Sequence, residues 1–300
     1  MSTHPESHSN PAAEPSLAPA AENLLALKPG AVFGNRFKIR RALGSGDEGG
    51  VWLAEDRPLN RTVVLKCLPD AICREAAAVN ALKEVTRCSS RLIHPNIART
   101  YEFVEAETIA AVALEYVHGN SLTQLRLERP QQAFDPGDLA AWIRSLRSAL
   151  EYAHDQMGLV HGGLRPDNLV VDTAGQLKLT GFGLAGAIKG WLARLEPRFR
   201  EVAPATLPRP SLPLSVSDDV YGVGAILYEL LTGAAPFEGG NLATSPGTSG
   251  SIPTMTERRT ARGISGAPIP AQWEQTVAAC LALDPARRPR GIANLAAGLE

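Results

Sequence analysis

The stretch Gly44-Ser-Gly46-Asp-Glu-Gly49-Gly-Val51 follows a run of alternating apolar and polar residues, Phe37–Leu43, and leads into Val51-Trp-Leu-Ala54. Alternation on both sides of a glycine-rich turn predicts a β-hairpin. Glycines in such a turn let backbone amides approach phosphate oxygens that side chains would keep away, although a tight turn alone also explains them. A dinucleotide-binding fold is disfavoured, because a helix should follow its glycines.

A lysine in the next apolar segment points to a buried ion pair. Lys66 lies seventeen residues after Gly49, in the segment Thr62–Leu68, whose β-branched residues predict a strand. An unpaired ammonium group in an apolar setting is costly, so Lys66 needs an acidic partner. The next segment, 74–92, has helical spacing, and its Glu84 is the partner that the sequence predicts.

The composition is that of an ordinary globular protein, with 44% hydrophobic and 20% charged residues among 300. The net charge of -1 gives no reason to expect a nucleic-acid partner. No apolar run approaches the ~18 residues that cross a bilayer, so we expect no membrane span. Cys67, Cys73, Cys88 and Cys280 form no Cys-x-x-Cys pair, which favours buried thiols in the reducing cytoplasm over a metal site or disulfide framework.

The residue composition and the spacing of apolar residues change along the chain. Residues 1–31 carry five prolines among small and polar residues, which predicts a disordered tail. Strand-like patterns prevail from there to about residue 117, and helical spacing prevails afterwards, notably in 139–156 and 220–232. The segment 239–256 is rich in Gly, Ser and Thr and is predicted to be a loop. This order predicts an α+β protein.

Further motifs occur in an order that is itself informative. They are Val63-Val-Leu-Lys66, His94-Pro-Asn-Ile97, Leu114-Glu-Tyr-Val-His-Gly119, Asp219-Val-Tyr-Gly-Val-Gly224, Leu230-Leu-Thr-Gly-Ala-Ala-Pro-Phe237 and Asp284-Pro-Ala-Arg-Arg-Pro289. With the glycine-rich loop, they make residues 33–300 resemble the Ser/Thr protein kinase family, in particular its bacterial eukaryotic-type members. The resemblance implies a two-lobed kinase-like domain over 32–300. Its N-lobe, 32–117, would hold a small antiparallel sheet with one main helix, and its C-lobe, 118–300, would be mainly helical.

The resemblance also implies a nucleotide site and roles for its residues. Lys66 would hold the α- and β-phosphates and pair with Glu84, while Leu114 would be the gatekeeper beside the adenine pocket. Backbone groups of Glu115 and Val117 would contact adenine. The complete implied set is Gly44, Gly46, Gly49, Val51, Val64, Lys66, Glu84, Leu114, Glu115, Val117 and Asn168. Val64 stands where the family has a smaller alanine, which crowds the adenine pocket.

The pattern departs from the family where the chemistry takes place. The family's catalytic loop reads His-Arg-Asp-Leu-x-x-x-x-Asn, and this chain reads His161-Gly-Gly163-Leu-Arg-Pro-Asp-Asn168. Gly163 therefore replaces the Asp that accepts the proton of the substrate hydroxyl. The family's Asp-Phe-Gly motif reads Gly181-Phe182-Gly183, so the carboxylate that holds Mg²⁺ is missing. The sequence predicts no catalytic residue and no metal site, because Mg²⁺ prefers at least one carboxylate ligand.

Neighbouring acids are poor replacements. Asp167 occupies a variable position beside Asn168, and Asp172 fits a turn. Asp47 and Glu48 lie at the tip of the glycine-rich loop, where they would either repel phosphates or form a solvated hairpin tip. The second interpretation is favoured.

The segment that should control activation is also altered. Residues 184–205 contain no Ser, Thr or Tyr that an activating phosphate would modify, and Gly162 replaces the arginine that would pair with that phosphate. The basic residues of this segment would either receive an acidic or phosphorylated partner or lie in a solvated loop, and the solvated loop is favoured; they are Lys189, Arg194, Arg198 and Arg200. The usual Ala-Pro-Glu end reads Ala203-Pro-Ala205, which removes the glutamate partner of Arg288, and Glu201 is the nearest substitute.

Three hypotheses follow from this pattern. The favoured one is a pseudokinase, a signalling or scaffold module that acts through contacts with a protein partner such as an active kinase or its substrate. A nucleotide sensor, in which ATP binds weakly and nearly independently of Mg²⁺, is a special case of it. The alternative is a weak or atypical Ser/Thr kinase with displaced catalytic residues, and His161-Gly162 gives slight support to a small-molecule phosphotransferase.

Overall fold

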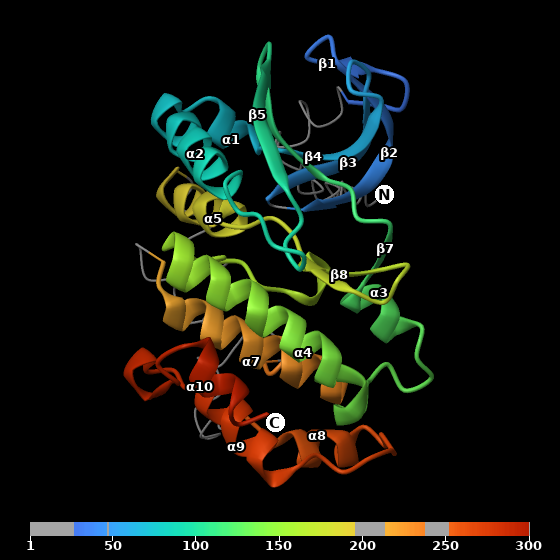
Figure 1. The fold of residues 1–300 in the computed structure, drawn as a ribbon, viewed down its shortest axis with the longest axis vertical. Helices are drawn as coiled ribbons and strands as arrows, with labels where there is room; N and C mark the ends of the chain where they lie inside the picture. The colour runs from blue at the N-terminus through green and yellow to red at the C-terminus, as the bar shows by residue number, and fades with distance from the viewer. Residues whose placement is uncertain (1–26, 47, 196–213, 238–251, 300) are drawn as a thin grey trace, which may run out of the picture.

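The computed structural model describes residues 27–46, 48–195, 214–237 and 252–299. These residues form two lobes, a smaller one built on an antiparallel sheet and a larger one that is mainly helical (Figure 1). The predicted α+β fold is therefore confirmed.

The sheet of the N-lobe forms because short apolar and β-branched segments alternate with glycine-rich or polar turns. Its strand order is β1-β2-β3-β4-β6-β5, and every neighbouring pair is antiparallel. The strands are β1 (Val32–Phe33), β2 (Phe37–Gly46), β3 (Gly49–Asp56), β4 (Arg61–Cys67), β5 (Thr100–Ala106) and β6 (Ile109–Glu115). The short helix α1 (Asp70–Cys73) and the longer α2 (Ala76–Ser89) connect β4 to β5.

The C-lobe surrounds one long buried helix, α7 (Val216–Thr232), as its apolar sequence predicts. The Ser215 side chain caps the first turn of α7, and Gly233, with φ of 72°, ends the helix in the left-handed conformation. Around α7 lie α3 (Leu122–Leu127), α4 (Pro136–Glu151) with a π-helical turn at Tyr152–Gln156, α8 (Met255–Ala261), α9 (Ala271–Cys280) and α10 (Ile292–Ala296). A small sheet, β7 (Gly119–Ser121), β8 (Leu169–Asp172) and β9 (Leu177–Leu179), faces the N-lobe.

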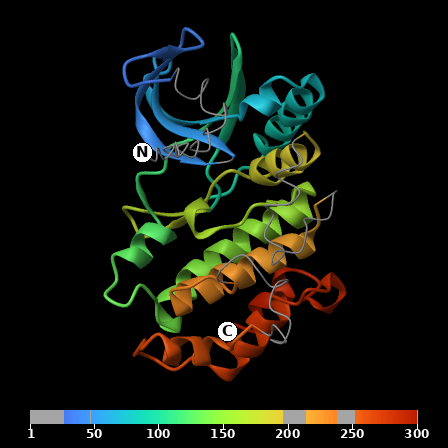
Figure 2. The same ribbon diagram turned by 180° about the vertical axis from the view of Figure 1, so that it is seen from behind.

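The helix α5 (Leu184–Leu195) follows the Gly181-Phe182-Gly183 motif directly. It lies beside α2 between the two lobes in both views of the molecule (Figures 1 and 2). Its buried Ile188 and Leu192 join Ile72 of α1 and Leu82 of α2 in one apolar cluster. A segment predicted to be a loop is thus a helix that packs against the N-lobe.

The folded part begins earlier than the predicted boundary at residue 32. Leu27 is buried against the N-lobe sheet, and the backbone amide of Gly30 donates to the carbonyl of Ile39. Residues 27–31 therefore belong to the folded body, and residues 1–26 lie outside the described part of the chain.

Candidate functional site

A cleft of about 960 Å³ runs between the lobes, and most of the predicted nucleotide residues line it. These are Gly44, Gly49, Val51, Val64, Lys66, Leu114, Glu115, Val117 and Asn168. Gly46 pairs with Gly49 across the hairpin. Glu84 is not among the lining residues, and its side chain is exposed to solvent.

The inner wall of the cleft is set by strand register. Val64 on β4 lies opposite Leu114 on β6, and Val51 on β3 lies opposite Lys66. The carboxylate of Glu115 accepts a hydrogen bond from the Arg99 amide at 2.8 Å and from the Lys178 ammonium at 2.6 Å. Glu115 is the last residue of β6 in the N-lobe, and Lys178 lies on β9 in the small sheet. Their ion pair therefore connects the end of β6 to that sheet.

The predicted ion pair between Lys66 and Glu84 is wrong. Lys66 Nζ instead lies 2.9 Å from Glu48 Oε2, and Glu84 pairs with Arg87 at 2.6 Å. Arg87 lowers the pKa of Glu84, so this acid is ionised on the outer face of α2. The cause is the orientation of α2. Its buried Leu82 faces α5, and a residue two positions later lies about 200° around the helix, away from the cleft.

The prediction that Glu48 is a solvated hairpin tip is also wrong, whereas Asp47 lies outside the described residues. The Glu48 side chain is only 19% exposed and points into the cleft. Its Oε1 lies 3.2 Å from Lys189 Nζ of α5 and 3.9 Å from an Arg165 nitrogen. Desolvation raises the pKa of Glu48, but Lys66 and Lys189 outweigh it, so the net pKa lies below its usual value.

The backbone of the loop His161–Asn168 is fixed from below by a buried carboxylate. Asp219 of α7 accepts hydrogen bonds from the amides of His161 at 2.7 Å and Gly162 at 2.8 Å, and it lies 2.8 Å from His154 Nε2. Asp219 thus braces the catalytic loop from the buried helix α7. At the other end of the loop, the Asn168 side chain donates a hydrogen bond to the carbonyl of Gly163 at 2.7 Å.

His161 is held in its neutral form by its two ring contacts. Its Nδ1 faces the amide of Gly163 at 3.2 Å and therefore accepts, which leaves Nε2 to donate to the carbonyl of Thr180 at 3.0 Å. Complete burial lowers the pKa of His161 accordingly. Its ring meets Phe182 edge-on at 4.8 Å, so both are packed core residues.

Helix α5 lies against the catalytic loop at a distance that only glycines allow. A Cβ at Gly163 would overlap the Cβ of Ala185, and a Cβ at Gly186 would lie 2.8 Å from the carbonyl oxygen of Gly162. At Gly162, φ is 69°, and a Cβ would overlap the side chain of Leu214. Helix α5 can therefore pack this closely on the loop only because Gly162, Gly163 and Gly186 have no side chains.

A family model described as the protein kinase domain matches residues 37–296. The chain belongs to the protein kinase family. It is 30% identical over 216 residues to serine/threonine-protein kinase PrkC of Bacillus subtilis, covering 68% of this chain and 31% of PrkC. It is 30% identical over 222 residues to the probable serine/threonine-protein kinase PknB of Lactococcus lactis, covering 70% of this chain and 34% of PknB. The chain thus spans about a third of the length of these relatives.

A solved structure confirms the fold. The kinase domain of Mycobacterium tuberculosis PknI superimposes with a TM-score of 0.69 at 23% identity, covering 91% of this chain and 97% of that chain. The predicted membership of the bacterial eukaryotic-type Ser/Thr kinases and the predicted two-lobed kinase fold are both confirmed. The family implies that ATP is the ligand of the cleft.

The metal-binding Asp-Phe-Gly motif of the family corresponds to Gly181-Phe182-Gly183 in this kinase domain. Gly181 offers no side chain, and the space where its Cβ would lie is open to 4 Å. The Asn168 side chain donates its N–H to the carbonyl of Gly163 at 2.7 Å, which leaves its Oδ1 as the oxygen that this residue offers to a metal ion. Within the described ranges, no group of three or more His, Cys, Asp or Glu side chains could hold a metal ion. Mg²⁺ is a hard cation that is usually bound through one or two carboxylates, and this position has none.

Two further predictions concern the C-lobe of the kinase domain. Arg288, whose glutamate partner is missing, donates to the backbone carbonyls of Ala282 at 2.9 Å and Ser217 at 3.0 Å. Burial is the main reason that its pKa is lowered. Glu201, its suggested substitute partner, lies outside the described residues.

Among the described helices, none is long and apolar enough to cross a membrane.

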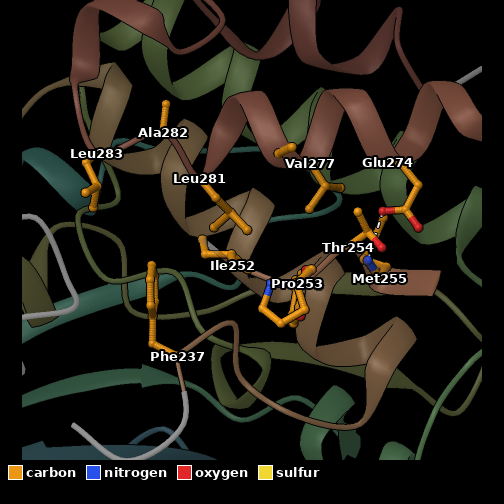
Figure 3. Close-up of a pocket in the computed structure, with 12 residues that line it drawn as sticks. Phe237, Ile252, Pro253, Thr254, Met255, Glu274, Val277, Leu281, Ala282 and Leu283 are labelled. Atoms are coloured by element: carbon orange, nitrogen blue, oxygen red, sulfur yellow. Dashed lines mark hydrogen bonds between the residues drawn. The ribbon is translucent and has the colours of Figure 1, made fainter. Parts of the chain in front are cut away.

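A second, smaller cavity of about 280 Å³ lies in the C-lobe of the kinase domain (Figure 3). Its wall is mainly apolar and includes Phe237, Ile252 and Leu281. The one acid at its edge, Glu274, accepts hydrogen bonds from the amides of Met255 and Thr256 and so stabilises the start of α8. The described residues that line the cavity include no His, Cys or Lys, and we assign it no chemistry.

Proposed function

We propose that this chain is a pseudokinase, a kinase-fold module that transfers little or no phosphate and acts in signalling through contacts with a protein partner. One observation carries the proposal. Gly163 and Gly181 occupy the two positions where the family has its catalytic and metal-binding carboxylates. A general base typically contributes ~10²–10⁴-fold to a rate, and loss of the metal clamp adds to that loss.

The packing of α5 supports the same conclusion. The helix fills the place beside Gly163 that a longer side chain would need, and its Lys189 reaches Glu48 within the cleft. Lys66 is engaged with Glu48 in this arrangement. We infer that ATP is bound weakly in this state, and that binding depends little on Mg²⁺ because the metal position lacks a carboxylate.

A weak or atypical Ser/Thr kinase is the second candidate. It is favoured by the names of the relatives, which are Ser/Thr kinases, and by the retention of Lys66 and Asn168 in the cleft. In that case Asp167, which lines the cleft next to Asn168 and is 52% exposed, is the carboxylate that would replace the missing base.

Two measurements on the purified chain test these alternatives. A transfer assay with ATP and either Mg²⁺ or Mn²⁺ should give no signal above that of a Lys66→Ala variant. Transfer that Lys66→Ala abolishes would establish the weak kinase instead. A thermal-shift titration with ATP should give a small shift that is nearly the same with and without Mg²⁺. For scale, a ligand at 100 times its dissociation constant stabilises a fold by ~2.7 kcal/mol. A large shift that requires Mg²⁺ would contradict the proposal.

A further inference from the structure

The Glu48 carboxylate lies where three cations from three separate elements converge. Lys66 comes from β4, Arg165 from the loop that follows His161, and Lys189 from α5. Their nitrogens lie 2.9, 3.9 and 3.2 Å from the Glu48 oxygens. We call these three residues the cation cluster. By the family resemblance Lys66 is the phosphate-binding residue, Arg165 belongs to the catalytic loop, and Lys189 belongs to α5.

The hairpin can place Glu48 in the cleft because of its glycines. Gly49 has a φ of 103°, and a Cβ there would overlap the carbonyl oxygen of Cys67 at the end of β4. The turn is therefore folded closely onto β4, which only glycine permits. This fold brings the Glu48 side chain over the end of Lys66 instead of into solvent.

A carboxylate satisfies the cation cluster incompletely. Glu48 Oε2 accepts a hydrogen bond from Lys66, and Oε1 forms an ion pair with Lys189 Nζ at 3.2 Å, so a single carboxylate is shared among the three cations. Among the described residues, Asp167 is the other acid beside the cluster, 3.5 Å from Arg165. In this described part of the site, three positive charges thus face two negative ones. A phosphate chain carries more oxygen acceptors and more charge than one carboxylate, so it matches the cluster better.

We propose that Glu48 is an internal occupant of the phosphate subsite, and that a nucleotide polyphosphate displaces it and binds the cation cluster without a divalent cation. In this arrangement Lys189 and Arg165 supply the positive charge that Mg²⁺ supplies in other kinases. Glu48 competes with the ligand for Lys66, which weakens nucleotide binding in the native chain. The inference rests on the proposed function, because it requires a cleft that binds nucleotide without a carboxylate-held metal.

The test compares Glu48→Gln with the native chain by calorimetric titration of ATP in EDTA. Glutamine keeps the size of the side chain and removes its charge. We expect Glu48→Gln to bind ATP about tenfold or more tightly than the native chain, because a charged competitor for Lys66 is gone. Affinity for adenosine should be unchanged. Glu84→Gln, which removes an exposed acid paired with Arg87 on α2, is the matched control and should bind ATP like the native chain.

A second substitution tests the cations directly. Lys189→Ala in the Glu48→Gln background should reverse most of the gain in affinity for ATP and leave that for adenosine unchanged. Equal affinity of Glu48→Gln and the native chain for ATP would overturn the inference, and so would tighter binding that disappears in EDTA. These outcomes are independent of the transfer assay. Failure of the proposed function appears as phosphate transfer by the native chain, whereas failure of this inference appears as unchanged affinity.

Discussion

Replacing Gly163 by alanine tests whether α5 is docked on the catalytic loop as tightly as the structure indicates. The new Cβ would overlap the Cβ of Ala185, whereas carbon atoms in contact prefer about 3.5–4.0 Å, so α5 would have to retreat by roughly 1 Å. Overpacking of this kind costs about 1–3 kcal/mol. Restricting the unfolded chain offsets about 0.4–1 kcal/mol of that cost. The difference between these two ranges is about 0–2.6 kcal/mol, and we expect a net loss near its middle, about 1–2 kcal/mol, in the free energy of unfolding.

Two readouts follow this change. For a domain of this size, 1 kcal/mol corresponds to about 2–4 °C, so the melting temperature should fall by about 2–8 °C. The half-buried Trp191 of α5 packs in the cluster with Leu82 of α2. Its fluorescence, obtained as the difference from a Trp191→Phe variant, should shift to longer wavelength as α5 loosens.

Two other glycines serve as controls for Gly163→Ala. Gly137 lies in the first turn of α4 with nothing within 4 Å of its Cβ position, so Gly137→Ala should leave stability unchanged or raise it slightly. Gly181 also has open space but a φ of 78°, so Gly181→Ala should cost about 1–2 kcal/mol through backbone strain and leave Trp191 unaffected. Native stability and native Trp191 emission in Gly163→Ala would refute the packing argument.

Three other predictions concern stability. Asp219→Asn replaces an acceptor of two backbone amides with a group that carries donors, so it should lower the free energy of unfolding by about 1.5–3 kcal/mol in urea titrations; native stability would show that the bracing is unimportant. The pKa of His161 is lowered from 6.5, so the contribution of neutral His161 to the free energy of unfolding is complete above pH 6.5 and is lost as the pH falls. Between pH 6.5 and 5, the free energy of unfolding should decline by up to about 1.4 kcal/mol per pH unit. His161→Phe should make this dependence on pH weaker. Thr254→Ala removes the side chain that accepts from the Glu257 amide at the start of α8 and should cost about 0.5–2 kcal/mol in thermal melts, whereas Thr260→Ala in the same helix should cost less.

Local sequence patterns were sufficient to predict the two lobes and several of their main elements. Alternation around Gly44–Val51 gave the β2–β3 hairpin, and the apolar run near 220–232 gave α7 with its terminal Gly233. The strand β5 and the small sheet β7–β9 were not predicted, since they are short and lack clear alternation. The capping box Thr254–Glu257 is a sequence signal for the start of α8, which begins inside the segment 239–256 that is predicted to be a loop.

The partners of the charged groups were predicted poorly, because they depend on how distant elements pack. Glu84 lies on the predicted helix. However, α2 turns its buried face, with Leu82, towards α5, and this orientation leaves Glu84 in solvent. Glu48 was expected to be solvated, yet the fold of Gly49 onto β4 turns it inward. No local pattern encodes either result. Residues 184–195 did carry a usable signal, since their apolar positions at helical spacing and the absence of Pro are compatible with a helix.

The most direct test of the pseudokinase assignment is the transfer of the γ-phosphate from radiolabelled ATP to the chain itself and to a general protein acceptor, with Mg²⁺ and with Mn²⁺. Lys66→Ala defines the background of the assay. We expect incorporation by the native chain to equal that background over many hours, because Gly163 and Gly181 leave no carboxylate at either catalytic position. Incorporation above the Lys66→Ala background would contradict the assignment and show that the chain is an active kinase.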